Sequence, residues 1–258
     1  MTILVIGKKG AISRALLKYN HYLFFDNLDD LDFDKVLSDS KIKTIIYSRG
    51  YSQASPIHYL NSKKLIISNV FNPNEIYKKL DKFKINLFIY LSTNKIKYYE
   101  AYIHFFIIEK FIKFFRPYLW SKWIGENYLT NNSKNNNCKL LVLRIPPIIG
   151  TIPKGKLKYI IKHIKILNLI KVIIPNIKIN FLSISNLNNF FLKVDVNFSE
   201  NNFINISDYY EFISLHRLIK LVYLIKKNST LEINSLINSG IISQEFVNDL
   251  TSTIKVKY

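Results

Sequence analysis

Cysteine is almost absent from this chain of 258 residues: Cys138 is the single one, so no disulfide can form within the molecule. A globular chain that does without disulfides is typical of a reducing compartment. The first residues, Met1 and Thr2, lead directly into an apolar run, without the basic and then long apolar segment of a secretory leader. We therefore expect a cytoplasmic protein.

Long uninterrupted apolar stretches are missing too. The most apolar region, residues 98–120, is broken by charged side chains such as Glu100, Glu109 and Lys110. Such interruptions exclude a membrane-spanning helix, although they leave a peripheral membrane contact through this basic, aromatic segment open. We expect no integral membrane segment.

Acidic residues are scarce, with 18 Asp and Glu against 37 Lys and Arg. Such an excess permits binding to nucleic acid, to anionic membranes or to phosphorylated ligands. The basic residues are scattered without a dense run, and no recognised nucleic-acid-binding module is visible. Lys, Asn and Ile are all abundant, as in proteins from AT-rich genomes, so we favour compositional drift and expect no nucleic-acid partner. A nucleic-acid-binding protein is the weakest of three hypotheses and would bind with a steep salt dependence.

The first fifty residues alternate between short apolar runs and helical spacing. Buried strands are predicted at 2–6, 22–25 and 43–47, and helices at 11–19 and 29–37. Strand, turn, helix and strand within about thirty residues open a doubly wound α/β domain. The predicted fold class is therefore α/β, a Rossmann-like doubly wound parallel sheet with a small C-terminal α/β substrate domain.

The turn after the first strand carries two glycines, Gly7 and Gly10. In such domains glycines let the backbone approach a dinucleotide pyrophosphate, and the start of the next helix presents free N–H groups to the phosphates. Asp26 ends the second strand, near the place where an acid grips the adenosine ribose hydroxyls. Its carboxylate would repel the 2′-phosphate of NADP, whereas Lys8 and Lys9 would attract it. We expect NAD as the cofactor, with NADP as the alternative.

The remaining chain keeps this alternation up to Gly150 and is less regular after it. Strands are expected at 86–91, 140–145 and 203–206 with extended structure at 171–184, helices at 73–80, 98–115, 118–128, 157–170, 187–194 and 215–225, two short helices after Asn228, and a polar loop at 130–137. The break near Gly150 predicts a cofactor-binding domain over 1–150 and a smaller substrate-binding region over 151–258, interleaved with the first. The five histidines show no metal-ligand spacing, so we expect no metal site.

A tyrosine and a lysine, Tyr118 and Lys122, stand four residues apart at the start of a predicted helix. Positions i and i+4 share a helix face, so the phenol and the amine can point into one site. A neighbouring cation lowers a tyrosine pKa from about 10 toward the range of a proton-transfer group. This is the chemistry that a carbonyl or alcohol redox step needs beside a hydride carrier. On its own, the pair is more simply a partly buried aromatic beside a solvated charge.

Further motifs follow in order along the chain. After Gly7-x-x-Gly10 and Asp26 come Leu91-Ser92-Thr93, Tyr118-x-x-x-Lys122, Leu143-Arg144-x-Pro146 and Gly150. In this order they resemble the extended short-chain dehydrogenase/reductase family, whose members include NAD(P)-dependent epimerases, dehydratases and reductases that act on nucleotide sugars. Ser121-Lys122-x-x-x-Glu126 and Phe203-Ile204-Asn205-Ile206 are similar to family segments as well. Thr93 precedes Tyr118 by 25 positions, a separation usual in the family.

The resemblance implies a role for each motif. Tyr118 would be the general acid/base, Lys122 would lower its pKa and hold the nicotinamide ribose, and Thr93 would hydrogen-bond the substrate oxygen. The residues expected to contact the cofactor are Gly7, Lys9, Gly10, Ala11, Ile12, Asp26, Ser48, Arg49, Leu91, Tyr118, Lys122, Pro146 and Pro147. The substrates would be nucleotide sugars, the context surface-polysaccharide synthesis, and the helices within 98–128 the place where family dimers commonly pair.

The sequence also departs from the family pattern. Ser13 stands where the turn usually has a third glycine, Asn94 where many dehydratases and deoxysugar reductases carry Asp, and Lys95 where dehydratases use Glu. Asn94 and Lys95 argue against 4,6-dehydration. The leading hypothesis is an NAD(P)-dependent nucleotide-sugar epimerase or 4-keto reductase. The second is a catalytically degenerate dinucleotide-binding or partner-binding protein that has kept the fold.

Overall fold

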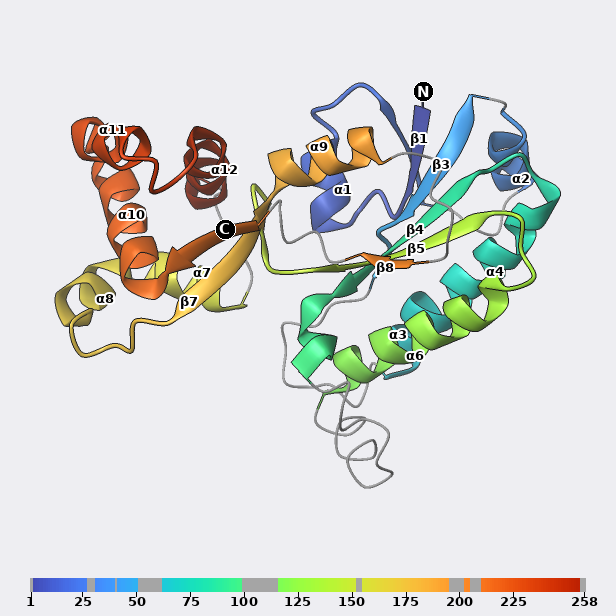
Figure 1. Ribbon diagram of the computed structural model, residues 1–258, viewed down its shortest axis with the longest axis horizontal. Coiled ribbons are helices and arrows are strands. Elements are labelled where there is room, and N and C mark those ends of the chain that lie inside the picture. The colour runs from blue at the N-terminus through green and yellow to red at the C-terminus, as the bar shows by residue number, and fades with distance from the viewer. Residues whose placement is uncertain are drawn as a thin grey trace. The chain divides into compact units, whose positions relative to one another are not determined.

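The computed structural model describes residues 2–26, 31–39, 41–50, 62–98, 116–151, 155–194, 202–204 and 210–255. The chain divides into two units, of which unit 1 comprises Met1–Ile145 and Val194–Ile206, and unit 2 comprises Pro146–Lys193 and Ser207–Tyr258 (Figure 1). The first change of unit lies a few residues before the boundary expected at Gly150, and the chain later returns to unit 1. The aromatic helix expected at 98–115 falls almost wholly outside the described residues.

Unit 1 is built on a six-stranded sheet in the order β2-β1-β3-β4-β5-β8, and every neighbouring pair is parallel. Its strands are β1 (Thr2–Ile6), β2 (Tyr22–Phe25), β3 (Ile42–Tyr47), β4 (Leu87–Thr93), β5 (Lys139–Ile145) and β8 (Asn202–Ile204). Its helices are α1 (Ala11–Leu16), α2 (Leu31–Leu37), α3 (Ser62–Ile66), the π-helical turn η2 (Ile67–Phe71), α4 (Asn72–Lys79), the 3-10 turns η3 (Leu80–Lys82) and η4 (Asn94–Tyr98), and α6 (Pro117–Ser133). The Rossmann-like parallel sheet predicted from the sequence is confirmed.

The central strands of this sheet are buried on both faces. Ile3, Leu4, Val5 and Ile6 follow one another in β1, and none of their side chains is more than 1% exposed. Successive side chains of a strand point to opposite faces, so a strand without alternation needs packed layers on both sides. This is why β1, β3, β4 and β5 read in the sequence as continuous apolar runs.

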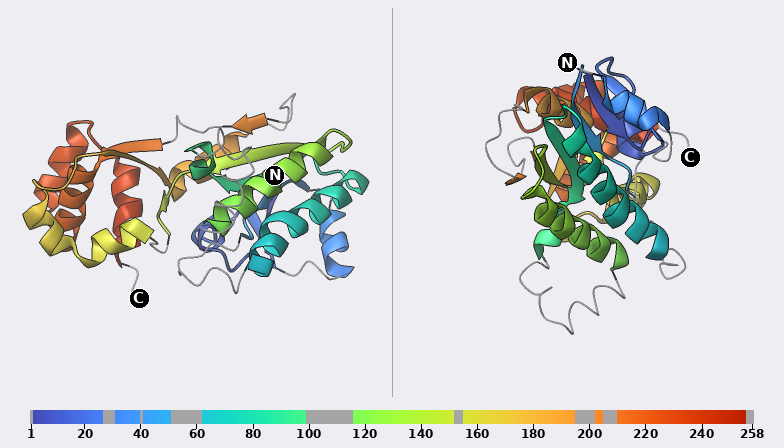
Figure 2. Two further views of the ribbon diagram at one scale, coloured as in Figure 1. Left: turned by 90° about the horizontal axis from the view of Figure 1, so that it is seen from below. Right: turned by 90° about the vertical axis from the view of Figure 1, so that its right-hand side faces the viewer.

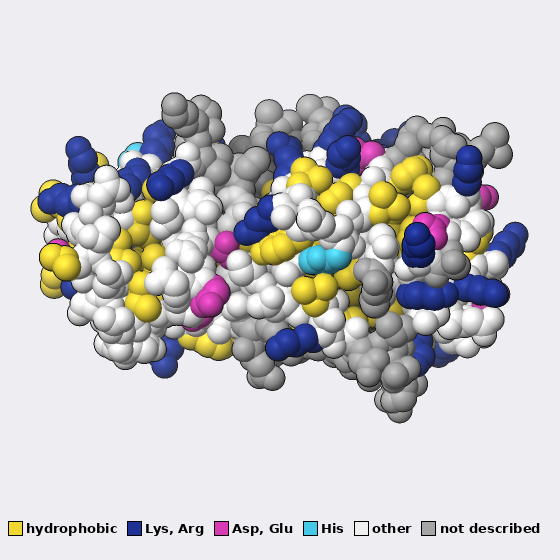
Figure 3. All heavy atoms as spheres, turned by 90° about the horizontal axis from the view of Figure 1, so that it is seen from above, with side chains coloured by type: hydrophobic (Ala, Val, Ile, Leu, Met, Phe, Trp, Pro, Cys, Tyr) yellow, Lys and Arg dark blue, Asp and Glu magenta, His cyan; other side chains and the backbone are white. Residues whose placement is uncertain are grey.

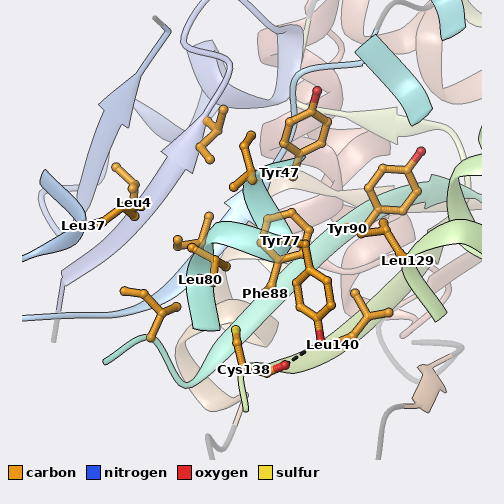
Figure 4. Packing of buried hydrophobic residues seen from close by; sticks show 14 of the residues in the cluster. Leu4, Leu37, Tyr47, Tyr77, Leu80, Phe88, Tyr90, Leu129, Cys138 and Leu140 are labelled. Atoms are coloured by element: carbon orange, nitrogen blue, oxygen red, sulfur yellow. Dashed lines mark hydrogen bonds between the residues drawn. The ribbon is translucent and has the colours of Figure 1, made fainter. Parts of the chain in front are cut away.

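One core lies between the sheet and the helices α2, α4 and α6. Phe33 of α2, Tyr77 of α4 and Leu129 of α6 pack there with alternate residues of the central strands, such as Phe88 and Tyr90 (Figure 4). Helices α4 and α6 lie side by side on this face in both ribbon views (Figures 1 and 2). The core therefore fixes α6, which carries the tyrosine and the lysine singled out above, against β4 and β5.

Cys138 belongs to the same core. Its backbone carbonyl accepts a hydrogen bond from the Tyr77 hydroxyl (Figure 4), and its side chain is 1% exposed. Burial, and then the neighbouring Asp81, raise the pKa of the thiol to about 12. Because the thiolate is the reactive form, this cysteine is a packing residue and not a nucleophile.

Unit 2 contains a three-stranded sheet in the order β6-β7-β9, in which β7 is parallel to β6 and antiparallel to β9. The strands are β6 (Ile148–Ile149), β7 (Lys178–Ser183) and β9 (Tyr210–Ser214), and the helices are α7 (Gly155–Lys162), α8 (Ile164–Ile170), α9 (Ile184–Lys193), α10 (Leu215–Lys227), α11 (Thr230–Asn238) and α12 (Gln244–Lys255). Phe181, Leu218 and Phe246 lie in its separate core. A small unit with mixed strands and helices agrees with the expectation for the C-terminal part.

Three predicted elements differ from the structure. Of the extended segment expected over 171–184, residues 171–174 form a turn and only Lys178–Ser183 form a strand, β7. The helix expected over 157–170 is two helices, because His163 leaves helical geometry at φ −107° and ψ 21°. The polar segment at 130–137 was expected to be a loop, but α6 continues through it as far as Ser133. Ser133 and Thr130 accept helical geometry there because their hydroxyls donate to backbone carbonyls of the preceding turn.

Candidate active site

The order of the sheet reverses at β1, which pairs with β2 on one side and with β3 on the other. In doubly wound sheets ligands bind at such a switch point, outside the carboxyl ends of the strands. The segments that leave the carboxyl ends of β1, β3 and β4 start at Gly7, Ser48 and Asn94. These segments contain most of the site residues predicted from the sequence.

The glycine turn is in contact with the segment after β3. Gly7 has φ +107°, and a Cβ at this position would lie 2.7 Å from the Cα and the backbone nitrogen of Arg49. A side chain is therefore excluded twice, by the backbone conformation and by the close approach of another chain segment. The Gly10 N–H donates to the Gly7 carbonyl at 2.9 Å and so closes the turn. The need for glycine at position 7 is therefore explained by packing within the protein. Gly10 is half-exposed at the start of α1, so its backbone is accessible to solvent.

Ser13 replaces the usual third glycine without leaving an unsatisfied hydroxyl. Its side chain is fully buried, and its Oγ lies 2.5 Å from Oγ of Ser48, where either hydroxyl can be the donor. The Ser48 hydroxyl also lies 3.2 Å from the carbonyl of Ile6, to which it can donate. The two serines form one hydrogen-bonded unit between α1 and the end of β3, so this departure from the family pattern is accommodated by Ser48.

Arg49 reaches across to the end of β2. Its Nη1 donates to the backbone carbonyl of Asp26 at 3.1 Å, and both residues are partly exposed. The structure thus brings together the acid expected at the ribose and an arginine expected to contact the cofactor. Lys8 and Lys9 are exposed in the turn beside them, and the Lys9 carbonyl accepts from Arg14 Nε at 3.1 Å. Ala11 and Ile12 follow as half-exposed residues of the first turn of α1.

Lys122 connects α6 to the end of β4. Its Nζ donates to the backbone carbonyl of Leu91 at 2.8 Å and lies 4.4 Å from the ring centre of Tyr90. The side chain is 4% exposed. The amine is therefore held two residues before Thr93, whose own side chain is 9% exposed at the last position of β4.

Tyr118 lies one helical turn before Lys122 and is partly exposed. The start of α6 is fixed beside η4, which directly follows Thr93, because Leu119 packs against Ile96. The hydroxyl, the phenol and the amine therefore come from two elements that meet at the carboxyl edge of the sheet. Their roles in catalysis stay predictions.

The expected effect of Lys122 on Tyr118 is not seen. Burial raises the pKa of Tyr118 to about 12, with no lowering contribution from the lysine. Burial lowers the pKa of Lys122 to about 7, against an opposing contribution from the Glu126 carboxylate. The physical reason is that the amine lies inside the protein, where it gives its hydrogen bond to the Leu91 carbonyl and is itself poorly solvated.

Glu126 and Arg144 form a buried ion pair beside this lysine. Nη2 of Arg144 donates to Oε2 of Glu126 at 2.7 Å, and its Nε lies 3.1 Å and 3.2 Å from the two carboxylate oxygens. The Glu126 side chain is fully buried and that of Arg144 is 16% exposed. Both residues stood in motifs noted in the sequence, but their pairing across α6 and β5 required the fold.

Asn69 is a site residue that sequence reasoning missed. It lies in the π-helical turn η2 and is fully buried, and its Nδ2 donates to Oγ of Ser121 at 3.0 Å. Its backbone carbonyl accepts from the Tyr90 hydroxyl at 2.7 Å. No local pattern marks a π-turn in the sequence, because such a turn is decided by what packs against it.

The backbone of Gly50 lies close to the side chains of both Asn69 and Lys122. A Cβ on this exposed glycine would lie 3.2 Å from Nζ of Lys122 and 3.3 Å from Oδ1 of Asn69. The backbone of Gly50 therefore packs closely against this amine and this amide oxygen, and a side chain here would crowd both. Gly50 was not among the predicted site residues, although it directly follows Ser48 and Arg49.

The other predicted contacts have varied positions. Leu91 is 5% exposed, and its backbone carbonyl accepts the hydrogen bond from the Lys122 amine. Pro146 and Pro147 follow β5 at the start of unit 2, where the Pro147 carbonyl accepts from Leu182 N–H at 3.1 Å; their part in cofactor binding stays a prediction. Of the helices expected to form a dimer contact, α6 is described but residues 99–115 are not, so the dimer also stays a prediction. Among the described residues, no group of His, Cys, Asp and Glu could hold a metal ion.

Comparison with solved structures finds the same architecture. UDP-glucuronic acid 4-epimerase from Bacillus cereus, in complex with UDP-glucuronic acid and NAD, matches with a TM-score of 0.66 and 16% identity over 99% of each chain. The Bordetella bronchiseptica enzyme WbmG in complex with NAD matches with a TM-score of 0.59 and 14% identity, over 86% of this chain and 77% of WbmG. RMD from Pseudomonas aeruginosa, complexed with NADPH, matches with a TM-score of 0.59 and 17% identity, over 88% and 83%.

This chain shares their fold. The resemblance noted in the sequence motifs is thereby confirmed at the level of the fold, including the smaller unit after the sheet. Neither the protein-family models nor the curated protein sequences contain a match to the chain. Within the described residues, no helix is both long and apolar enough to span a membrane.

Proposed function

We propose that this chain is an NAD(P)-dependent enzyme that acts on a nucleotide sugar, as an epimerase or a 4-keto reductase. The observation that carries the proposal is the position of Lys122, whose amine binds the Leu91 carbonyl two residues before Thr93. The same lysine lies one helical turn after Tyr118. The Lys122 amine is thus held at the edge of the parallel sheet where ligands bind in doubly wound folds, and we propose that the Tyr118 phenol and the Thr93 hydroxyl act there together with it. The shared fold with an NAD-bound UDP-glucuronic acid 4-epimerase supports the same reading.

The residues at this edge fit a dinucleotide. Gly50 brings its backbone close to the Lys122 amine, because a Cβ there would lie only 3.2 Å from Nζ. Lys8 and Lys9 are exposed in the glycine turn, where their positive charge would attract a pyrophosphate. Asp26 offers a carboxylate for ribose hydroxyls and disfavours a 2′-phosphate. We therefore propose NAD as the cofactor, with NADP as the alternative that the two lysines would favour.

The protonation of the site favours proton donation by Tyr118. With a pKa raised to about 12, the phenol keeps its proton at neutral pH and can give it to a substrate oxygen. The Thr93 hydroxyl would hydrogen-bond the same oxygen and orient it. When bound, NAD(P) would supply the hydride donor or acceptor. For the reverse proton transfer the phenolate needs a cation, and Lys122 is the one that the helix places one turn away.

The experiment is a substitution at the phenol. Purified protein should bind NAD(H) or NADP(H) and turn over a member of a panel of nucleotide sugars. Tyr118→Phe should abolish turnover and keep cofactor binding, because it removes only the hydroxyl. Tyr128→Phe is the matched control, since Tyr128 lies on the same helix and is 54% exposed. Full activity of Tyr118→Phe would refute the assignment.

A second candidate is a catalytically degenerate protein that binds a dinucleotide or a partner. The observation that favours it is that the Lys122 amine is 4% exposed and is already engaged by the protein's own Leu91 carbonyl. An amine so committed has to release this hydrogen bond before it can serve a ribose or a phenolate. Cofactor binding without turnover of any nucleotide sugar in the panel would favour this candidate over the enzyme.

A further inference from the structure

Helix α8 and the turn that follows it expose a group of aliphatic side chains in unit 2. The exposed fractions are 81% for Leu169, 85% for Val172 and 83% for Ile173. We name the whole group the outer aliphatic surface; its members are Ile166, Leu169, Ile170, Val172, Ile173 and Ile177. Soluble proteins rarely leave so many neighbouring aliphatic residues in water unless something binds there.

The exposure follows from the spacing of the residues. Ile164 is buried and Leu167 and Ile174 pack against the core of unit 2, so α8 is anchored by one face. Ile166, Leu169 and Ile170 recur at i, i+3 and i+4 within α8, which places them together on the opposite face, and Val172 and Ile173 follow as exposed residues of the turn. The segment is therefore apolar on both sides, and only one side is covered within the described part of unit 2.

The segment that carries this surface has charge of one sign. Residues 155–194 contain seven lysines and no Asp or Glu. Lys162, Lys165 and Lys178 are exposed, and Lys171 is partly exposed within the surface itself. Elsewhere on the molecule, the face that Figure 3 displays also has more Lys and Arg side chains than Asp and Glu side chains. A complementary partner therefore carries negative charge and accepts aliphatic side chains.

We propose that the outer aliphatic surface docks on an anionic lipid bilayer. A short helix with aliphatic residues on its outer face and lysines beside them is the pattern of a segment that lies in the plane of a membrane interface. The lysines would contact anionic headgroups while the aliphatic side chains enter the boundary of the acyl chains. The proposal does not depend on the catalytic assignment.

Two other occupants fit the observations less well. A second copy of this chain, paired about a two-fold axis, would set the same lysines against one another, and like charges oppose such an interface. The other occupant is a different protein. Protein interfaces favour Tyr, Trp and Arg at their centres and are depleted in Lys. The outer aliphatic surface instead consists of Ile, Leu and Val with lysines around them.

The test is flotation of the full chain with vesicles of phosphatidylcholine alone and with added phosphatidylglycerol. We expect binding to the anionic vesicles and little to the neutral ones. Leu169→Gln should weaken binding about tenfold, because it removes a side chain that enters the bilayer. Leu231→Gln is the matched control, since Leu231 is 84% exposed in the same unit but outside the surface, and it should bind as the unsubstituted chain does.

A variant that lacks three lysines separates the electrostatic contribution to vesicle binding from the contribution of the aliphatic side chains. Lys165→Gln, Lys171→Gln and Lys178→Gln combined should weaken binding on the order of a hundredfold, at about fivefold for each lysine near an anionic surface. Circular dichroism should show both variants folded, since all the substituted side chains lie at the surface. Equal losses in Leu169→Gln and Leu231→Gln, no preference for anionic vesicles, or a dimer that Leu169→Gln dissociates would each overturn the proposal. Binding to an acidic protein with no binding to vesicles would also overturn it.

Discussion

Arg144 of β5 donates to the fully buried carboxylate of Glu126 on α6, with Nη2 2.7 Å from Oε2 and Nε 3.1 Å and 3.2 Å from the two oxygens. This pair ties the helix that carries Tyr118 and Lys122 to the strand next to β4. It also places a negative charge one helical turn after Lys122, where it opposes the loss of the lysine's proton. The pair is therefore a structural support of the proposed active site.

Removing one partner should be far more damaging than removing both. Arg144→Leu leaves the Glu126 carboxylate buried without its cation, so we expect a loss of about 3–5 kcal/mol in the free energy of unfolding. Arg144→Leu combined with Glu126→Leu removes the uncompensated charge and should recover much of that loss. Urea denaturation of the single and double variants measures both values. An additive double variant would contradict a direct coupling of the two side chains.

The buried amine of Lys122 makes stability depend on pH in a defined direction. Its pKa falls from 10.5 to about 7 on folding, so between these values the unfolded chain binds more protons than the folded chain. Stability should therefore rise with pH across this window, because the cost of burying the charge is fully present below about pH 7 and is relieved above it. Lys122→Met should remove this rise, which urea denaturation at several pH values would detect.

The control for that measurement is Lys134→Met, at an exposed lysine just beyond α6. Its stability should follow the unsubstituted chain in parallel over the same pH range. If the Lys122→Met curve were also parallel, the amine would titrate as it does in the unfolded chain. The lowered pKa of Lys122 would then be wrong.

Replacement of Gly7 by alanine should cost more stability than the same replacement of Gly240. Ala at this position meets both a φ of +107° and the backbone of Arg49 at 2.7 Å, so backbone strain and a steric clash add together. Gly240 has φ +68° with no atom within 4 Å of its missing Cβ, so Gly240→Ala should cost only the strain of about 1–2 kcal/mol. Thermal or urea unfolding should show Gly7→Ala as clearly the less stable of the two. Equal losses would mean that the turn moves away from Arg49.

The two serines between α1 and β3 should behave as a unit. Ser48→Ala leaves the buried Ser13 hydroxyl without its partner and should cost about 1–3 kcal/mol. Ser48→Ala combined with Ser13→Gly removes both hydroxyls and restores the glycine usual in the family, so part of the stability should return. A double-mutant cycle by urea denaturation gives the coupling energy. A coupling near zero would show that the 2.5 Å contact contributes nothing.

The sequence determined the sheet and the positions of its ends. Parallel strands buried on both faces have to be continuous apolar runs, so β1, β3, β4 and β5 were visible without the fold. The turn at Gly7, the end of the fourth strand two residues before Thr93 and the helix with Tyr118 and Lys122 followed from local signals of spacing and chain breaks. Because the carboxyl ends of parallel strands share one edge, these signals were enough to predict a site there.

Tertiary structure decided how the side chains of that site are engaged. No local pattern shows that Lys122 turns inward to Leu91, that Ser48 satisfies Ser13, or that Asn69 lies in a π-turn beside Ser121. Each of these contacts joins residues far apart in the chain, and its strength depends on how completely water is excluded around it. The same exclusion raises the pKa of Tyr118 and lowers that of Lys122, so only the packed molecule sets the chemistry that the motif suggests.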